Sequence, residues 1–354
     1  MAELGEPVPF SLYIYEPNKG APIFFTIAYA ITTAFHVWQC HRYNAWRLIG
    51  LHPLCGLMFT VGYGMRIWGS HNFLYKDDDI TPLIMFIVSQ CLIYICPSCL
   101  VHHRQLTHHT RYSSPLLELA NYHILGRIFS YVPHCSPFPP GKVLALFGGL
   151  MLVVEALNAL GVSLSANPSS GSTQQSIGRN MTIAAITMQL IIILAFVSLA
   201  LIFYRRCQNI HVHSRSVKTM LTTLYMSMAL IFARCVYRLV EHTGHTHKDL
   251  DDLESLRQLN PLFRFEVFFY IFEATLMLVN SIVWNVWHPG RFLPQHDHVY
   301  LGPDGTEVVG EKNEDNRPTW AKITNIVTFG IMYRRKALRQ QFQELAERPS
   351  TVDR

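Results

Sequence analysis

Apolar stretches of about twenty residues alternate with short polar segments along most of this chain. The hydrocarbon core of a bilayer needs about 20 apolar residues per crossing helix, so each stretch is long enough to span a membrane. The pattern predicts an all-α fold, a polytopic membrane helix bundle with about seven transmembrane helices in residues 21–290. The predicted spans are Ala21–Cys40, Arg47–Gly69, Thr81–Leu100, Lys142–Leu164, Met181–Tyr204, Met220–Val240 and Leu262–Trp287.

The charges of the connecting segments predict the orientation of this bundle. Lys and Arg are retained on the cytoplasmic side of a membrane. The odd-numbered connections are basic, as at Arg205 and Arg206, whereas the second is mainly acidic, with Asp77–Asp79. This alternation predicts an external N-terminal segment (1–20) and a cytoplasmic tail (291–354). It also argues against an eighth crossing at Leu116–Val132, an apolar block that carries charged residues.

Two polar segments outside the spans have a predicted character. The external loop Pro168–Gly178 is rich in Ser, Gln and Gly, which is typical of a flexible linker. In the tail, residues 320–347 show an apolar face and a basic face, which predicts an amphipathic helix on the anionic inner leaflet. A solvated tail helix is the alternative interpretation.

Composition agrees with a membrane protein and excludes some partners. Hydrophobic residues make up 50% of the chain and charged residues 15%, compared with roughly 25% charged residues in soluble domains. The net charge of +5 is modest and the basic residues are scattered, so nucleic acid is not an expected partner. The eight cysteines fall in apolar or predicted cytoplasmic segments, so a disulfide framework is not expected.

Ionisable side chains inside the predicted helices are the candidate functional residues, because a charge at the bilayer centre costs about 2.5–3.5 kcal/mol on insertion scales. Arg234, Arg238 and Glu241 have the i, i+4, i+7 spacing of one helix face. Glu266, Glu273 and Asn280 follow at seven-residue intervals, which predicts a polar stripe on the last helix. We expect Arg–Glu pairs between these two helices, with Arg238 level with Glu266 and Arg234 near Glu273.

Polar residues on the other predicted spans extend this set. They are His36, Arg66, Glu155, Asn158 and Gln189. Two interpretations stay open. The residues either form buried clamps that fix helix packing, or line a polar pathway for the head group of an amphipathic substrate or for protons.

Motifs for catalysis and cofactor binding are weak or missing. Gly305–Gly310 resembles a phosphate-binding loop but is followed by Glu311 rather than Lys, and no hydrolase or metalloprotease motif occurs. The histidines of the apolar segments show no repeated pairing of the kind that holds haem. We therefore expect neither enzyme activity nor a cofactor. The weak metal-site candidates are Cys96, Cys99, His102 and His103, whose spacing fits no zinc-finger pattern closely.

Several short motifs, in order along nearly the whole chain, carry a family resemblance. They include Tyr15-Glu16-Pro17, Ala120–Arg127, Trp287-His288-Pro289-Gly290 and Asp304-Gly305-Thr306-Glu307. The chain resembles the fungal lipid-translocating exporters, seven-helix proteins linked to aminocholesterol resistance and sphingoid-base release. The resemblance implies a protein of the plasma membrane, or alternatively an endomembrane, that moves or protects against amphipathic lipids. It implies no cofactor.

This chain departs from the family pattern at one place. In the family, the third helix runs on as if Pro97 were joined to Pro115, whereas here Ser98–Ser114 intervenes. We interpret residues 98–114 as an insertion in or after the third helix, either lineage-specific or an unspliced intron translated in frame.

The leading functional prediction is translocation or export of an amphipathic lipid, a sphingoid base or a sterol-like amphiphile. Carboxylates in the pathway would suit a cationic head group. The alternative is a receptor-like sensor of lipids or stress, which would also suit seven helices and an external N-terminus. A membrane redox enzyme is a third class and would require haem.

Overall fold

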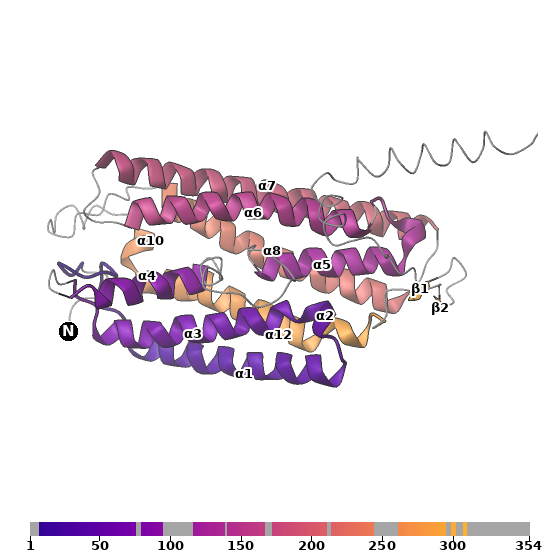
Figure 1. Cartoon of the computed structure of the whole chain (residues 1–354), viewed down its shortest axis with the longest axis horizontal. Helices are drawn as coiled ribbons and strands as arrows, with labels where there is room; N and C mark the ends of the chain where they lie inside the picture. Colours follow the sequence, from indigo (N-terminus) through magenta and orange to yellow (C-terminus); the bar gives the residue numbers. More distant parts are fainter. Residues whose placement is uncertain are drawn as a thin grey trace, which may run out of the picture.

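The computed structural model describes residues 7–75, 79–94, 116–138, 140–166, 172–210, 214–243, 261–294, 299–301 and 307–309. Over these residues the chain is an elongated bundle whose long helices lie along one axis (Figure 1). The predicted all-α membrane bundle is confirmed. Its principal helices are α1 (Gly20–Arg42), α3 (Leu51–His71), α4 (Thr81–Tyr94), α5 (Leu116–Tyr131), α6 (Pro140–Ala166), α7 (Ser172–Asn209), α8 (Arg215–Thr243) and α12 (Leu276–Val286). The short α2 (Trp46–Ile49) precedes α3.

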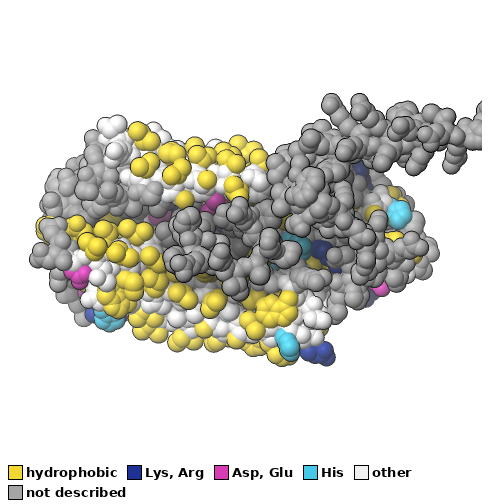
Figure 2. Space-filling view, in the orientation of Figure 1, with side chains coloured by type: hydrophobic (Ala, Val, Ile, Leu, Met, Phe, Trp, Pro, Cys, Tyr) yellow, Lys and Arg dark blue, Asp and Glu magenta, His cyan; other side chains and the backbone are white. Residues whose placement is uncertain are grey.

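The outer surface of the bundle suits a bilayer. Within the described residues, five helical stretches are long and apolar enough to cross it: α1, Lys142–Gly161, Thr173–Asn209, α8 and Glu266–Arg291. Large apolar side chains such as Phe24 and Ile191 are more than half exposed. Hydrophobic side chains cover much of the face over α1, α3, α6 and α7 in Figure 2. Such a surface is stable against lipid tails but not against water. The number of crossings and their orientation remain predictions.

The predicted third span, Thr81–Leu100, contains α4, and the apolar block Leu116–Val132, which was not predicted as a crossing, contains α5. Both α4 and α5 pack against α3, and they lie one after the other along the long axis of the bundle (Figure 1). Residues 95–115 between them, which include the whole of the proposed insertion, lie outside the described residues.

α7 begins earlier than the sequence predicts. The segment expected to be part of a flexible loop is helical from Ser172 onward, about two and a half turns before Met181. Packing against α6 accounts for this difference. At Gly161 of α6 there is no side chain to separate the helices, so an added Cβ would meet Thr182 and, at 2.8 Å, the carbonyl oxygen of Gly178. The close contact supports the additional turns despite their polar sequence.

The last predicted span is irregular. It consists of α10 (Pro261–Arg264), α11 (Glu266–Phe269), the π-helix η3 (Tyr270–Thr275) and α12. Two side chains satisfy backbone carbonyls in or beside the π-helix. Tyr29 Oη of α1 donates to the Ala274 oxygen at 2.9 Å, and Thr275 Oγ1 donates to the Tyr270 oxygen at 2.8 Å. π-Turns are rare and are found frequently at functional sites.

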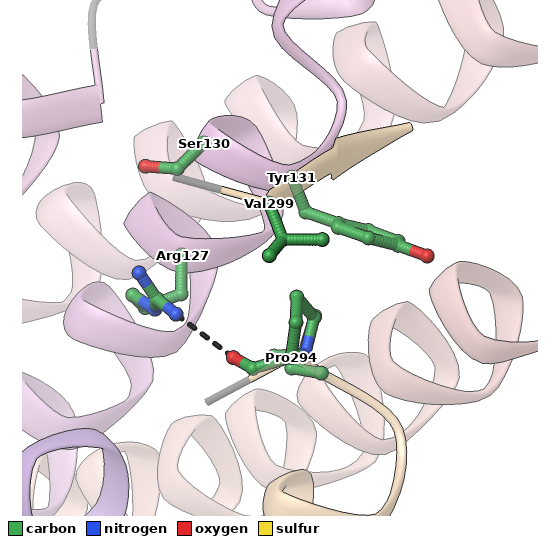
Figure 3. Close-up of a pocket in the computed structure, with 6 residues that line it drawn as sticks. Arg127, Ser130, Tyr131, Pro294 and Val299 are labelled. Atoms are coloured by element: carbon green, nitrogen blue, oxygen red, sulfur yellow. Dashed lines mark hydrogen bonds between the residues drawn. The ribbon is translucent and has the colours of Figure 1, made fainter. Parts of the chain in front are cut away.

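The beginning of the predicted polar tail is folded onto the bundle. Strands β1 (Val299–Leu301) and β2 (Glu307–Val309) pair antiparallel, and β1 packs against α5. Arg127 donates to the Pro294 oxygen at 3.0 Å beside Tyr131 and Val299 (Figure 3). Tyr131 Oη also donates to Glu307 Oε1 at 2.8 Å. The predicted amphipathic helix at 320–347 lies outside the described residues.

Candidate functional site

Buried polar side chains form three successive clusters along the interior of the bundle. The last span contributes one residue to each cluster: Glu266 to the first, Glu273 to the middle one and Ser281 to the third. Their order along this span gives the order of the clusters. A rise of about 1.5 Å per residue separates neighbouring members by roughly 10 Å. The clusters therefore extend over most of the thickness of a membrane's hydrocarbon core.

The first cluster is centred on Arg66 of α3, whose side chain is 1% exposed. Its Nη2 donates to Glu266 Oε1 and to Tyr15 Oη, both at 3.1 Å, and its Nε donates to Tyr270 Oη at 3.3 Å. The guanidinium carbon also lies 4.3 Å from the centroid of the Phe269 ring. An ion pair, two phenol oxygens and aromatic faces thus compensate for the desolvation of this charge.

The N-terminal segment closes this end of the bundle. Leu12 and Phe10 exchange backbone hydrogen bonds with Phe73 and Tyr75, at 3.0 Å and 2.8 Å. The backbone nitrogen of Asn18 donates to Glu266 Oε2 at 2.7 Å. Burial raises the pKa of Tyr15 and the nearby Arg66 partly opposes that rise. Its phenol therefore remains neutral and accepts the hydrogen bond from Arg66.

The middle cluster is built around an ion pair between α8 and the π-helix. Arg234 Nε donates to Glu273 Oε1 at 2.6 Å, and Glu273 is fully buried. Beside it, Glu118 of α5 accepts from Tyr122 Oη at 2.9 Å and from Gln189 Nε2 of α7. The cluster thus joins α5, α7, α8 and the last span through charged and polar groups.

Glu155 of α6 completes the middle cluster. Its side chain is 5% exposed and interacts electrostatically with Glu118, Arg238 and Arg234. One turn further along α6, Asn158 is 6% exposed. Within the described residues, Glu155 Oε2 and Asn158 Oδ1 have no hydrogen-bond partner. These two oxygens are therefore open acceptors inside the bundle.

The third cluster lies at the other end and is rich in histidine. His36 Nε2 is 3.2 Å from Ser281 Oγ, and the His36 and His52 ring centroids are 5.6 Å apart. Trp284 Nε1 and Asn121 Nδ2 both donate to Ser227 Oγ, at 3.0 Å and 2.9 Å. These hydrogen bonds join α5 and α8 to α12.

Predicted Arg–Glu pairing is confirmed for one pair and corrected for the other. Arg234 pairs with Glu273, as the sequence predicts, but Glu266 pairs with Arg66 of α3 rather than with Arg238. The π-helix explains the difference. Its wider turns rotate Glu266 relative to Glu273, so the two carboxylates face different helices although their spacing predicts one stripe. Asn280, seven residues after Glu273, is fully buried.

The remaining sequence candidates divide between placed and undescribed residues. Glu241 accepts from Tyr237 Oη at 3.4 Å on α8, and Gln189 contacts Glu118. The metal candidates Cys96, Cys99, His102 and His103 lie outside the described residues. Sequence reasoning missed the roles of Glu118 and Asn121 because it placed Leu116–Val132 outside the spans. Their i, i+3 spacing within an apolar block was the available signal.

Comparison with known proteins identifies the family. The model of the RTA1 like protein family matches residues 53–296, which include the middle cluster and the Arg66–Glu266 pair. This chain belongs to the RTA1-like family. A Leptosphaeria maculans relative named "Lipid-translocating exporter-like protein RTA1" is 49% identical over 350 residues, which is 97% of this chain and 64% of that protein.

Two further relatives are more distant. An Ajellomyces capsulatus protein with the same name is 29% identical over 60% of this chain and 66% of its own length. The "Probable lipid transporter atnI" of Emericella nidulans is 22% identical over 83% of this chain and 70% of its own length. The chain therefore spans about two thirds of the length of its RTA1-like relatives. No solved structure matches it.

Proposed function

We propose that this RTA1-like protein translocates amphipathic lipids across its membrane, with a sphingoid base or a sterol-like amphiphile as substrate. The observation that carries the proposal is the series of buried polar clusters inside a bundle whose outer surface is apolar. A lipid head group needs polar partners while it crosses the hydrocarbon core, whereas its tail is stable in the surrounding lipid. The names of the relatives support a lipid as the cargo.

The middle cluster suits a cationic head group better than an anionic one. Three carboxyl groups (Glu118, Glu155 and Glu273) lie near two guanidinium groups (Arg234 and Arg238). Carboxylates make strong, charge-assisted hydrogen bonds with an ammonium group. We therefore place a long-chain base ahead of a sterol-like amphiphile. The plasma membrane is the proposed location, because release of a toxic amphiphile from the cell requires export there.

Reconstitution tests this proposal. The purified full-length protein is placed in liposomes, a fluorescent long-chain base is added outside, and an impermeant quencher measures how much reaches the inner leaflet. We expect faster transfer than in protein-free liposomes. Transfer no faster than in protein-free liposomes, from a protein that remains folded, would refute translocation and favour the lipid or stress sensor.

A further inference from the structure

Glu155 differs from the other buried glutamates in its lack of a partner. Its Oε2 has no hydrogen-bond partner within the described ranges and is inaccessible to solvent, and the side chain is 5% exposed. By contrast, Glu273 and Glu266 are held by Arg234 and Arg66. A buried acceptor without a donor destabilises the folded protein, and does so more strongly if it is charged. A group retained at that cost is a candidate for binding a ligand that supplies the donor.

Asn158 provides a second open acceptor next to the first. It follows Glu155 by three residues on α6, so the two side chains share one face of the helix. Asn158 Oδ1 also has no donor within the described residues, and the side chain is 6% exposed. The pair therefore presents a carboxylate oxygen and an amide oxygen to the same buried space. A ligand with two neighbouring hydrogen-bond donors would satisfy both.

The surrounding charges indicate which sign this ligand carries. Arg234 is already paired with Glu273, so its charge is largely compensated where it faces Glu155. Glu118 has the largest charge effect on Glu155 among its neighbours, ahead of Arg238 and Arg234. Within the described residues, Glu118 accepts hydrogen bonds from the neutral donors Gln189 and Tyr122, and the nearby Arg234 is shared with Glu273. A single positive charge is the ligand property that this environment favours.

We propose that Glu155 and Asn158 bind the head group of the transported lipid, and that this head group is a protonated amine with a further hydrogen-bond donor beside it. The ammonium group donates to the Glu155 carboxylate, and the second donor, such as an adjacent hydroxyl group, donates to Asn158 Oδ1. This assignment rests on the proposed lipid translocation. It separates Glu155 from Glu266 and Glu273, whose ion pairs hold helices together.

Ligand binding to the full-length protein in lipid nanodiscs tests the assignment. The probes are a fluorescent long-chain 2-amino-1,3-diol and its N-acetylated form, which has the same chain and hydroxyl groups but no charge. We expect the amine to bind at least about tenfold more tightly, the usual gain for a hydrogen bond to a charged partner. Glu155→Gln removes this preference, and Asn158→Leu weakens binding of both probes. The control Glu16→Gln removes one exposed carboxylate of the N-terminal segment and leaves binding unchanged.

A second measurement needs no variant. Dicyclohexylcarbodiimide modifies carboxyl groups in apolar surroundings, and mass spectrometry locates the modified residue. We expect the amine, but not the N-acetylated probe, to protect Glu155 in the wild-type protein. Equal binding of the two probes, or modification of Glu155 undiminished by the amine, would overturn the assignment.

The two proposals fail in distinguishable ways. Amine binding that depends on Glu155 without transfer between leaflets would remove the transport function and leave the binding site. Transfer between leaflets that is equally fast in a folded Glu155→Gln variant would leave the transport function and remove this site.

Discussion

The buried ion pair between Arg234 and Glu273 allows a quantitative test of the middle cluster. Arg234→Met removes the cation and leaves the Glu273 side chain, which is fully buried, without its partner. Its Oε2 already lacks a hydrogen bond within the described residues, so the carboxyl group would have none. Removal of one member of a buried pair typically costs about 3–5 kcal/mol. We expect a loss of stability in this range.

Substitution of the other member of the pair, Glu273, should lower the free energy of unfolding by a smaller amount. In Glu273→Gln the amide oxygen still accepts a hydrogen bond, and Arg234 retains its contact with the Ile93 oxygen at 3.5 Å. We expect a cost of about 1–3 kcal/mol. The double variant should be about 2 kcal/mol more stable than the sum of the two single costs predicts, because it leaves no unpaired charge.

Equilibrium unfolding of the purified protein by SDS in mixed micelles, followed by circular dichroism, measures these free energies. The four proteins of the cycle are compared at the same lipid and detergent composition. Single costs below about 1 kcal/mol that add in the double variant would refute the reasoning, because they would show that the two groups do not depend on each other.

Two further substitutions test packing, and one deletion tests the proposed insertion. Ser227→Ala should cost about 1–3 kcal/mol in the same unfolding assay because it removes the shared acceptor of two buried donors, whereas Ser198→Ala on the exposed face should be near neutral. Gly161→Ala should lower the melting temperature because its Cβ meets the α7 backbone; Gly149→Ala, with open space around it, should not. Deletion of residues 98–114 should preserve expression and melting temperature, because α4 and α5 each pack on α3. Sequencing of cDNA across codons 97–115 tests the origin of the segment, because transcripts that all contain it would refute an unspliced intron.

The positions of the helices could be predicted from the sequence because length and apolar content alone determine them. Each predicted span contains a helix at the expected place, although α7 is longer and residues 95–100 of the third span lie outside the described residues. The presence of polar groups in the interior was predictable for the same reason, since a charge within an apolar stretch is costly in a bilayer wherever it lies. Such predictions need no knowledge of neighbouring helices.

The partners of these polar groups could not be predicted, because they depend on helix rotation and on segments distant in sequence. The π-helix at Tyr270–Thr275 changes the face on which Glu266 lies, and no simple periodicity reveals it. The contact between Arg66 and Tyr15 depends on an N-terminal segment that folds back over the bundle. Glu118 appeared to lie outside the spans because the block that carries it is short and separated from α4.

The interpretations of the buried polar residues as packing clamps and as a pathway do not exclude each other, because the candidate residues do not all have the same partners. Arg66 forms an ion pair with Glu266, and Arg234 forms one with Glu273, and such pairs stabilise helix contacts without requiring a ligand. Glu155 and Asn158 are buried to a similar degree but have open acceptor atoms within the described residues. The clamps therefore fix the helices around these acceptors, as a binding site requires when its own groups must remain available to a ligand. We therefore propose that both interpretations apply to one bundle, each to a different subset of its buried polar residues.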